Sequence, residues 1–308
     1  MTIRRTLLGV AATLAAALVL TGCAANAQDE RPAASDGTRT VEHVFGSTEI
    51  ASTDRVAVLD GDRTMEAVVA LGIQPVAAVK PPLTGNYAQG VAEALDTEPA
   101  NLAGAEGEVD YEALLAAEPN LVIMHVLSDA DREMYNRASE IAPTVAITYT
   151  AAGWRDTLNQ TAIALDREAQ ADELLAAYDA ALAETDDVAG VDGETLSVVR
   201  VRSDHVRYMT YESSFPWSVL KELGYTAPET QESGDDGTET VTVSLENIDL
   251  LVADRVLVLV DAGTDDAVND LLADPLFADA EVTKLPSSDF LFGNVLTAQR
   301  MLDDFGTV

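Results

Sequence analysis

Three arginines lie close together in a chain that is otherwise poor in cations. Arg200, Arg202 and Arg207 fall within eight residues, although the 308 residues contain only 18 Lys and Arg against 53 Asp and Glu. The two-residue period of an extended strand puts Arg200 and Arg202 on one face. Guanidinium groups at a strand end can bind anionic oxygens such as carboxylates. They can equally pair with nearby acids such as Asp204 or Glu212, and the sequence leaves both interpretations open.

Aromatic side chains form a second candidate group. Tyr208 and Trp217 follow the arginines, and Tyr87 lies in a separate loop that contains Gly, Pro and Asn. Flat, partly apolar rings beside guanidinium groups are typical of pockets for bulky ligands. Packing in the core explains each ring equally well. We therefore take Tyr87, Tyr208 and Trp217, with Arg200 and Arg202, as candidate ligand-binding residues.

The sequence lacks the local signatures of enzymes and metal sites. His43, His125 and His205 are the only histidines and are widely spaced, whereas a zinc or manganese site needs several such ligands converging. No Gly-x-Ser-x-Gly, phosphate-binding glycine loop or His-Glu-x-x-His motif occurs. The sequence therefore favours a binding protein over an enzyme, with no resident metal or cofactor.

Two blocks of alternating strand and helix signals surround these candidates. In the first block we expect strands at 55–59, 76–79, 121–126 and 144–149, with helices at 65–71, 110–118 and 132–140. In the second we expect strands at 196–201, 256–260 and 282–285, with helices at 216–223, 245–251, 267–272 and 296–305. Helices between apolar strands predict an α/β fold with two lobes, each a mainly parallel sheet with flanking helices.

A long stretch without Gly or Pro separates the two blocks. Residues 154–188 carry apolar positions at helical spacing, beginning at Trp154. About 35 residues at ~1.5 Å each would give a rod of roughly 50 Å. We therefore predict one long helix that joins the lobes, with an N-terminal lobe at 41–150, a linking helix at 151–188 and a C-terminal lobe at 189–308.

The N-terminal residues are typical of an export signal. Arg4 and Arg5 precede an apolar run, and Leu-Thr-Gly-Cys ends at Cys23, the only cysteine. This ending resembles the lipobox of bacterial lipoproteins. The resemblance implies a signal peptide at 1–22, acylation of Cys23, and a lipid anchor at the extracytoplasmic face of the cell membrane. Residues 23–40 are small and polar, which predicts a flexible tether.

The net charge bears on the partners of the protein. A formal charge of -35 repels phosphate backbones, so nucleic acid is excluded as a partner. Because salt screens charges over roughly 8 Å, a local cluster of arginines can still set the potential inside a cleft.

Several motifs resemble the ferric siderophore and vitamin B12 binding proteins of ABC importers. The similarity runs through residues 41–59, 70–76, 110–123, 141–145, 214–216, 243–246, 274–276 and 302–305. It implies the class III substrate-binding fold, in which two lobes joined by one long helix enclose a ligand cleft. It also implies a monomer that binds a small-molecule iron chelate and delivers it to a permease dimer with ATPase subunits.

The same resemblance assigns further residues. Glu112 and Glu246 match the glutamates that dock onto permease arginines in this family, although each also suits a solvated helix end. Phe292 lies where family members often have a cleft tryptophan, so it joins the candidate ligand-binding residues. The predicted ligand is an iron(III)–siderophore. Cobalamin or haem is the alternative within the family, and a bare zinc or manganese ion is a third.

Overall fold

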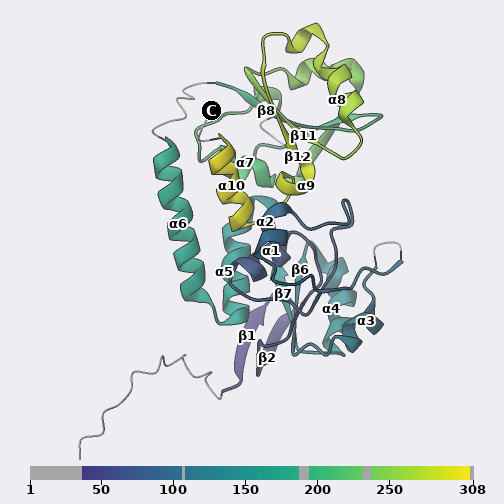
Figure 1. The fold of residues 1–308 in the computed structure, drawn as a ribbon, viewed down its shortest axis with the longest axis vertical. Coiled ribbons are helices and arrows are strands. Elements are labelled where there is room, and N and C mark those ends of the chain that lie inside the picture. Colours follow the sequence, from purple (N-terminus) through teal and green to yellow (C-terminus); the bar gives the residue numbers. More distant parts are fainter. Residues whose placement is uncertain (1–36, 106–107, 187–193, 232–236, 306–308) are drawn as a thin grey trace, which may run out of the picture. The chain divides into compact units, whose positions relative to one another are not determined.

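The computed structural model describes residues 37–105, 108–186, 194–231 and 237–305 (Figure 1). The predicted signal peptide, Cys23 and most of the predicted tether lie outside the described residues. The first strand begins at Arg39, within the last residues of the predicted tether. Residues 38–308 form one unit, which contains a two-stranded sheet and two five-stranded sheets.

The first lobe is built on a parallel sheet with the strand order β5-β4-β3-β6-β7. Alternate residues of its strand β6 enter two separate apolar cores, since Leu121 and Ile123 join one cluster and Val122 and Met124 the other. A short apolar run buried on both faces is the pattern of a parallel strand. The strands are β3 (Val56–Val58), β4 (Ala77–Ala78), β5 (Ala100–Asn101), β6 (Leu121–Val126) and β7 (Thr144–Thr148), preceded by the hairpin β1 (Arg39–His43) and β2 (Gly46–Ile50). The helices are α1 (Arg63–Ala70), α2 (Gln89–Ala94), α3 (Tyr111–Ala116) and α4 (Arg132–Ser139).

The second lobe has the strand order β10-β9-β8-β11-β12. Strands β8, β11 and β12 are parallel, and β9 and β10 are antiparallel additions at one edge. The strands are β8 (Leu196–Val201), β9 (Val206–Met209), β10 (Thr240–Val243), β11 (Arg255–Val260) and β12 (Glu281–Pro286). The helices are α7 (Phe215–Leu220), α8 (Asp265–Leu272), α9 (Ser287–Phe290) and α10 (Val295–Phe305), with a 3-10 segment at Leu245–Leu251. The prediction of an α/β fold with one sheet in each of two lobes is confirmed.

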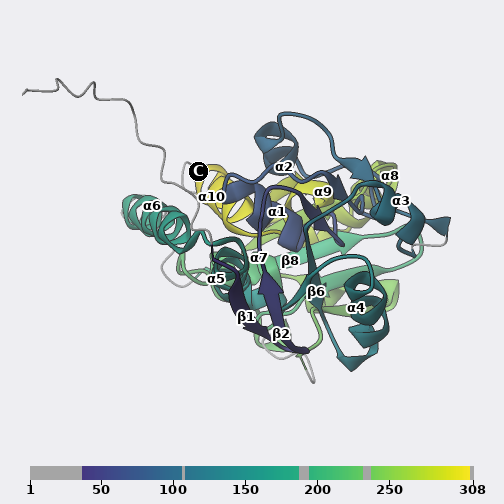
Figure 2. The same cartoon turned by 90° about the horizontal axis from the view of Figure 1, so that it is seen from below.

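The prediction of one continuous helix between the lobes is wrong. The segment forms α5 (Trp154–Leu165) and α6 (Glu168–Asp186), separated at Asp166, whose backbone is left-handed with φ 59° and ψ 51°. Asp tolerates this conformation better than most residues, so a helix can end there without Gly or Pro. Helix α5 packs on α1 and β7 of the first lobe, and α6 lies beside α5 and α10 (Figures 1 and 2).

The C-terminal helix α10 returns to the first lobe and is held there by a buried carboxylate. Glu66 of α1 accepts hydrogen bonds from the backbone N–H of Asn294 at 2.8 Å and of Thr297 at 2.9 Å. The Thr297 hydroxyl donates a third at 2.7 Å. Burial raises the pKa of Glu66 to about 7, although the hydrogen bonds from Thr297 and Asn294 act in the opposite direction. The first N–H groups of a helix have no carbonyl partner within the helix, and the Glu66 carboxylate accepts hydrogen bonds from such groups at the start of α10.

Glu66 should give the protein a distinctive pH dependence of stability. Its pKa is higher in the folded than in the unfolded protein, so the folded state binds the proton more tightly between about pH 4.5 and pH 7. The contribution of Glu66 to the free energy of unfolding therefore falls as pH rises through this window, by about 3 kcal/mol. In urea unfolding at a series of pH values, Glu66→Gln should gain stability relative to wild type by this amount between pH 4.5 and pH 7.5. Parallel curves for the two proteins would contradict the assignment.

Candidate functional site

A cavity of ≈ 880 Å³ opens between the loop after β4 and the strand ends of the second lobe. The first lobe lines it with the loop residues Leu83, Thr84, Asn86 and Tyr87, and the second lobe with Arg200, Arg202, Asp261, Lys284 and Ser287, among others. A smaller pocket next to it shares Arg200 and adds Asp62 and Phe292. The larger cavity falls in the size range of small-molecule sites, roughly 300 to 1,000 Å³.

Parallel pairing in the second sheet brings three polar residues to one point. Strand β11 pairs with β8 so that Val260 lies opposite Val201, and with β12 so that Val260 lies opposite Pro286. The residues that follow these three strand ends are Arg202, Asp261 and Ser287. Ligand sites of open α/β sheets form outside the carboxyl ends of parallel strands. The register alone therefore places this cluster in the cavity wall.

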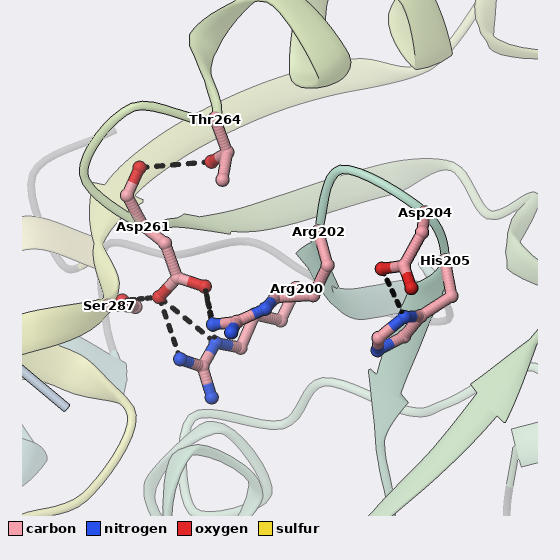
Figure 3. A network of polar contacts seen from close by, with 7 residues as sticks. All are labelled: Arg200, Arg202, Asp204, His205, Asp261, Thr264 and Ser287. Atoms are coloured by element: carbon pink, nitrogen blue, oxygen red, sulfur yellow. Dashed lines mark hydrogen bonds and ion pairs between the residues drawn. The ribbon is translucent and has the colours of Figure 1, made fainter.

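Asp261 is the centre of the cluster (Figure 3). Arg200 donates to its carboxylate from Nε at 3.0 Å and from Nη2 at 2.8 Å, and Arg202 donates from Nη1 at 2.6 Å. The Ser287 hydroxyl donates a short hydrogen bond to the same carboxylate. The Arg200 side chain is 8% exposed and that of Asp261 13%, whereas that of Arg202 is 41% exposed. The arginines therefore pair with an acid distant in the sequence, while Asp204 pairs with His205 and Glu212 with Lys221.

The electrostatics of the cluster keep Asp261 ionised. Burial by itself would raise the pKa of Asp261, but hydrogen bonds from Arg200, Ser287 and Arg202 outweigh it and the pKa lies below its usual value. The cavity wall carries three cations, Arg200, Arg202 and Lys284, against the carboxylates of Asp261 and Asp265. In a protein with a formal charge of -35, this wall is a local excess of positive charge.

The third arginine of the sequence cluster lies on the same side of the sheet. Arg207 of β9 is directly opposite Arg200 of β8 in an antiparallel pair, so both side chains project from one face. Like charges in this arrangement repel. Asp261 neutralises Arg200, whereas the buried Nε of Arg207 has no hydrogen-bond partner among the described residues. Arg207 therefore keeps one unpaired buried donor on the face of Arg200, but it is not among the residues that line the two described pockets.

The predicted aromatic residues divide between the cavity and the core. Tyr87 lines the cavity, and its buried hydroxyl has no hydrogen-bond partner in the described part of the chain. Burial raises the pKa of Tyr87 to about 12, with Glu98 and Asp60 adding to the effect, so its hydroxyl stays a donor at neutral pH. Phe292 lines the smaller pocket. Trp217 is 0% exposed and donates to the carbonyl of Met209, which makes it a core residue.

Tyr208 also belongs to the core of the second lobe. It is buried in the apolar cluster on the far face of β8 and β9, and its hydroxyl donates to the Thr230 carbonyl at 3.4 Å. Tyr208 follows Arg207 along β9, so its side chain projects from the opposite face. Neither Tyr208 nor Trp217 is among the residues that line the two described pockets.

Sequence reasoning missed three polar residues of the site. Arg63 of α1 stacks over the rings of Phe292 at 3.8 Å and Tyr149 at 4.8 Å, which connects the first lobe to the C-terminal segment. Asp261 and Lys284 line the cavity wall. The alignment of the strand ends would have found Asp261, because it follows β11 as Arg202 follows β8. No sequence signal of this kind marks Arg63, which is the first residue of α1.

The predicted docking glutamates both lie at exposed helix starts. Glu112 is in the first turn of α3, where the Asp110 side chain caps the helix by accepting from the N–H of Glu112 and Ala113. Glu246 is in the first turn of the 3-10 segment Leu245–Leu251. Exposed leucines accompany them, since Leu115 and Leu245 are among the most exposed large apolar residues described. Each lobe therefore presents one glutamate beside apolar surface.

The residues that the structure describes contain neither a metal site nor a membrane-spanning helix. No group of three or more His, Cys, Asp or Glu side chains there is placed to hold a metal ion. His125 instead lies 3.3 Å from Asp60, and His43 hydrogen bonds to Thr48. Among the same residues, no helix has the length and apolar character needed to cross a membrane.

Comparison with known proteins gives the family. Residues 56–284 match the periplasmic binding protein family, and the chain belongs to that family. The probable siderophore-binding lipoprotein YfiY of Bacillus subtilis is 32% identical over 222 residues, which cover 71% of this chain and 66% of YfiY. The ferric enterobactin-binding periplasmic protein FepB of Escherichia coli is 28% identical over 122 residues, covering 39% of this chain and 38% of FepB. Both alignments span less than two thirds of the relative's own length.

Solved structures share the fold. Staphylococcus aureus SirA complexed with staphyloferrin B superposes with a TM-score of 0.72 at 24% identity, covering 87% of this chain and 97% of SirA. Bacillus subtilis FeuA complexed with ferri-bacillibactin gives 0.70 at 18% identity, covering 87% of this chain and 96% of FeuA. At these identities the likeness establishes the two-lobed architecture.

The two arginines of the cluster should differ in their effect on stability. Arg200→Gln leaves the buried Asp261 carboxylate with fewer donors, so it should lower the free energy of unfolding by about 1–3 kcal/mol. Arg202→Gln removes a more exposed group, and should cost less than about 1 kcal/mol. Urea unfolding at neutral pH measures both. Equal costs for the two variants would contradict the arrangement around Asp261.

Proposed function

We propose that the protein is the extracytoplasmic solute-binding component of an ABC importer, and that it binds an iron(III)–siderophore in the cavity between its lobes. The observation that carries the proposal is the cationic cavity wall in a strongly acidic protein. The family assignment supports it, as do YfiY and FepB, whose names describe a siderophore and a ferric chelate as their ligands.

The cavity residues suit a bulky anionic chelate. Arg200 uses its Nε and Nη2 for Asp261, which leaves its Nη1 outside these bonds, and Lys284 adds an ammonium group to the same cavity wall. Guanidinium donors match carboxylate and catecholate oxygens. Tyr87 adds a buried hydroxyl donor, and Phe292 adds an apolar ring. Such a site binds its ligand without chemical change, so we assign no enzymatic role and no resident cofactor.

Other ligands are less well supported by this site. Cobalamin is large and nearly neutral, so it would leave the arginines without anionic partners. A bare zinc or manganese ion requires converging His, Cys, Asp or Glu ligands, and the described residues include no such group. Haem carries two carboxylates and is the second candidate, because Arg202 and Lys284 of the cavity wall could each donate to one of them.

Titration with ferric chelates tests the proposal. Binding of an anionic ferric tris-catecholate should quench the tryptophan fluorescence of the purified mature protein. The protein should bind cobalamin at least tenfold more weakly than this chelate. Arg202→Gln should weaken binding of the tris-catecholate by about tenfold or more, since Arg202 lines the cavity and a charged hydrogen bond contributes about 1.5–3 kcal/mol. Arg132→Gln is the matched control, because it removes one positive charge from the exposed end of α4 and should leave affinity unchanged. If wild type binds none of the ferric chelates, the proposal fails.

We further propose a membrane-attached monomer that docks on a permease dimer with ATPase subunits. Acylation of Cys23 would hold the protein at the extracytoplasmic face of the membrane, and two acyl chains give stable anchoring. Glu112 and Glu246 lie on different lobes, at exposed helix starts. Two carboxylates on rigid lobes can bind two basic sites on the partner at once, which multiplies their separate affinities.

Docking and ligand binding should separate experimentally. Glu112→Ala combined with Glu246→Ala should abolish uptake of the iron chelate by cells, because both carboxylates are lost, while the affinity for the chelate stays within about twofold. Uptake of radioactive iron and the fluorescence titration measure the two effects. Cys23→Ala in the same assay should lose uptake through release from the membrane fraction, where the double variant stays. Loss of chelate binding in the double variant would contradict the docking role.

A further inference from the structure

Asp261 already fills the position that an anionic ligand would take on the two arginines. Its carboxylate receives donors from Arg200 and Arg202 and from the hydroxyl of Ser287, and all four residues line the larger cavity (Figure 3). Two parallel N–H donors on one carboxylate are the geometry with which Arg binds carboxylates in ligands. The protein therefore carries an internal anion in its own binding wall.

This internal anion has an energetic consequence for a ligand. A donor already bound to Asp261 is not available at full strength to a second anion. The Asp261 charge also repels a negative oxygen placed beside the arginines, and this repulsion is screened less in a partly buried cavity than in bulk water. An anion with a single carboxylate must compete with Asp261 for the arginines, and it has no further anionic group to bind elsewhere in the cavity. A chelate with several anionic oxygens can also contact Lys284 or Tyr87, which line the same cavity.

We propose that Asp261 is a specificity-determining counter-anion, which competes with the ligand for Arg200 and Arg202 and so restricts the cavity to anionic chelates that make further contacts. The inference rests on the proposed function and deepens it. Removal of the Asp261 charge should strengthen binding of anionic ligands, which is the opposite of what loss of a ligand-contacting or positioning residue does. Neutral ligands should not sense the change.

Asp261→Asn tests this inference, because it keeps the shape of the side chain and one acceptor oxygen while removing the charge. Asp265→Asn is the matched control, since Asp265 lines the same cavity but makes no hydrogen bond with the arginines among the described residues. Three ligands are compared. Ferric enterobactin is an anionic tris-catecholate, ferrichrome is a neutral trihydroxamate, and acetate is an anion with a single carboxylate. Isothermal titration gives the dissociation constants.

We expect Asp261→Asn to bind ferric enterobactin at least tenfold more tightly than wild type, and to gain affinity for acetate, which wild type should bind weakly. Ferrichrome should change by less than twofold. Asp265→Asn should change enterobactin binding by less than threefold, because its charge acts only at longer range. Ser287→Ala, which loosens Asp261 without changing any charge, should raise enterobactin affinity severalfold and serves as the second variant if Asp261→Asn unfolds.

Several results would overturn the inference. Unchanged or weaker enterobactin binding in Asp261→Asn, with normal thermal unfolding, would make Asp261 a positioning residue for the arginines. If Asp261→Asn and Asp265→Asn gained the same affinity for ferric enterobactin, the change in net charge alone would explain the effect. In both cases wild type still binds its chelate, so the proposed function stands. Failure of wild type to bind any ferric chelate would overturn the function, and the role of Asp261 with it.

Discussion

The parallel pairing of β8, β11 and β12 is the constraint on which the candidate site depends. Its register ends three neighbouring strands at the same level, so that Arg202, Asp261 and Ser287 follow at one edge of the sheet. No loop has to be positioned separately to bring these groups together. The apolar residues of β8 alternate between two cores, which fixes the face from which Arg200 projects. A one-residue slip would turn Arg200 away from the cavity.

The site also depends on how an acidic protein maintains a cationic wall. The surface charge is screened within about a Debye length, whereas groups in a partly buried cavity interact at shorter range and in a lower dielectric. Asp261 then has two roles in one position: it stabilises two adjacent arginines in the absence of ligand, and it occupies donors that a ligand would use. The same contact thus links the stability of the empty protein to its affinity for anions.

The sequence predicted most strands and helices of the two lobes because their signals are local. The apolar runs of β6 and β8 were predicted with the bounds that the structure has, since both faces of each strand are buried. Strand β9 was missed, because Arg207 and Tyr208 were interpreted as cleft residues rather than as alternating faces of a short strand. The break at Asp166 was also missed, since nothing in the side chains of the linking segment marks a left-handed residue.

Only the part of the candidate site that depends on local sequence was predictable. The spacing of Arg200 and Arg202 correctly predicted that the two side chains lie together at the end of a strand. Their partner Asp261 is distant in the chain, and only the sheet register brings it close. Burial separates Trp217 from Tyr87, and that difference depends on packing between elements, which composition does not show. Residue type therefore suggested the chemistry, and topology decided which residues take part.

A crystal structure of the mature protein with a ferric tris-catecholate tests the central claim most directly, with diffraction data collected at the iron absorption edge. The account predicts one strong anomalous peak inside the cavity between the loop that contains Tyr87 and the strand ends of the second lobe, with chelate oxygens within hydrogen-bond distance of at least one of the arginines. An iron peak elsewhere on the protein, or iron bound directly by side chains with no chelate around it, would contradict the account.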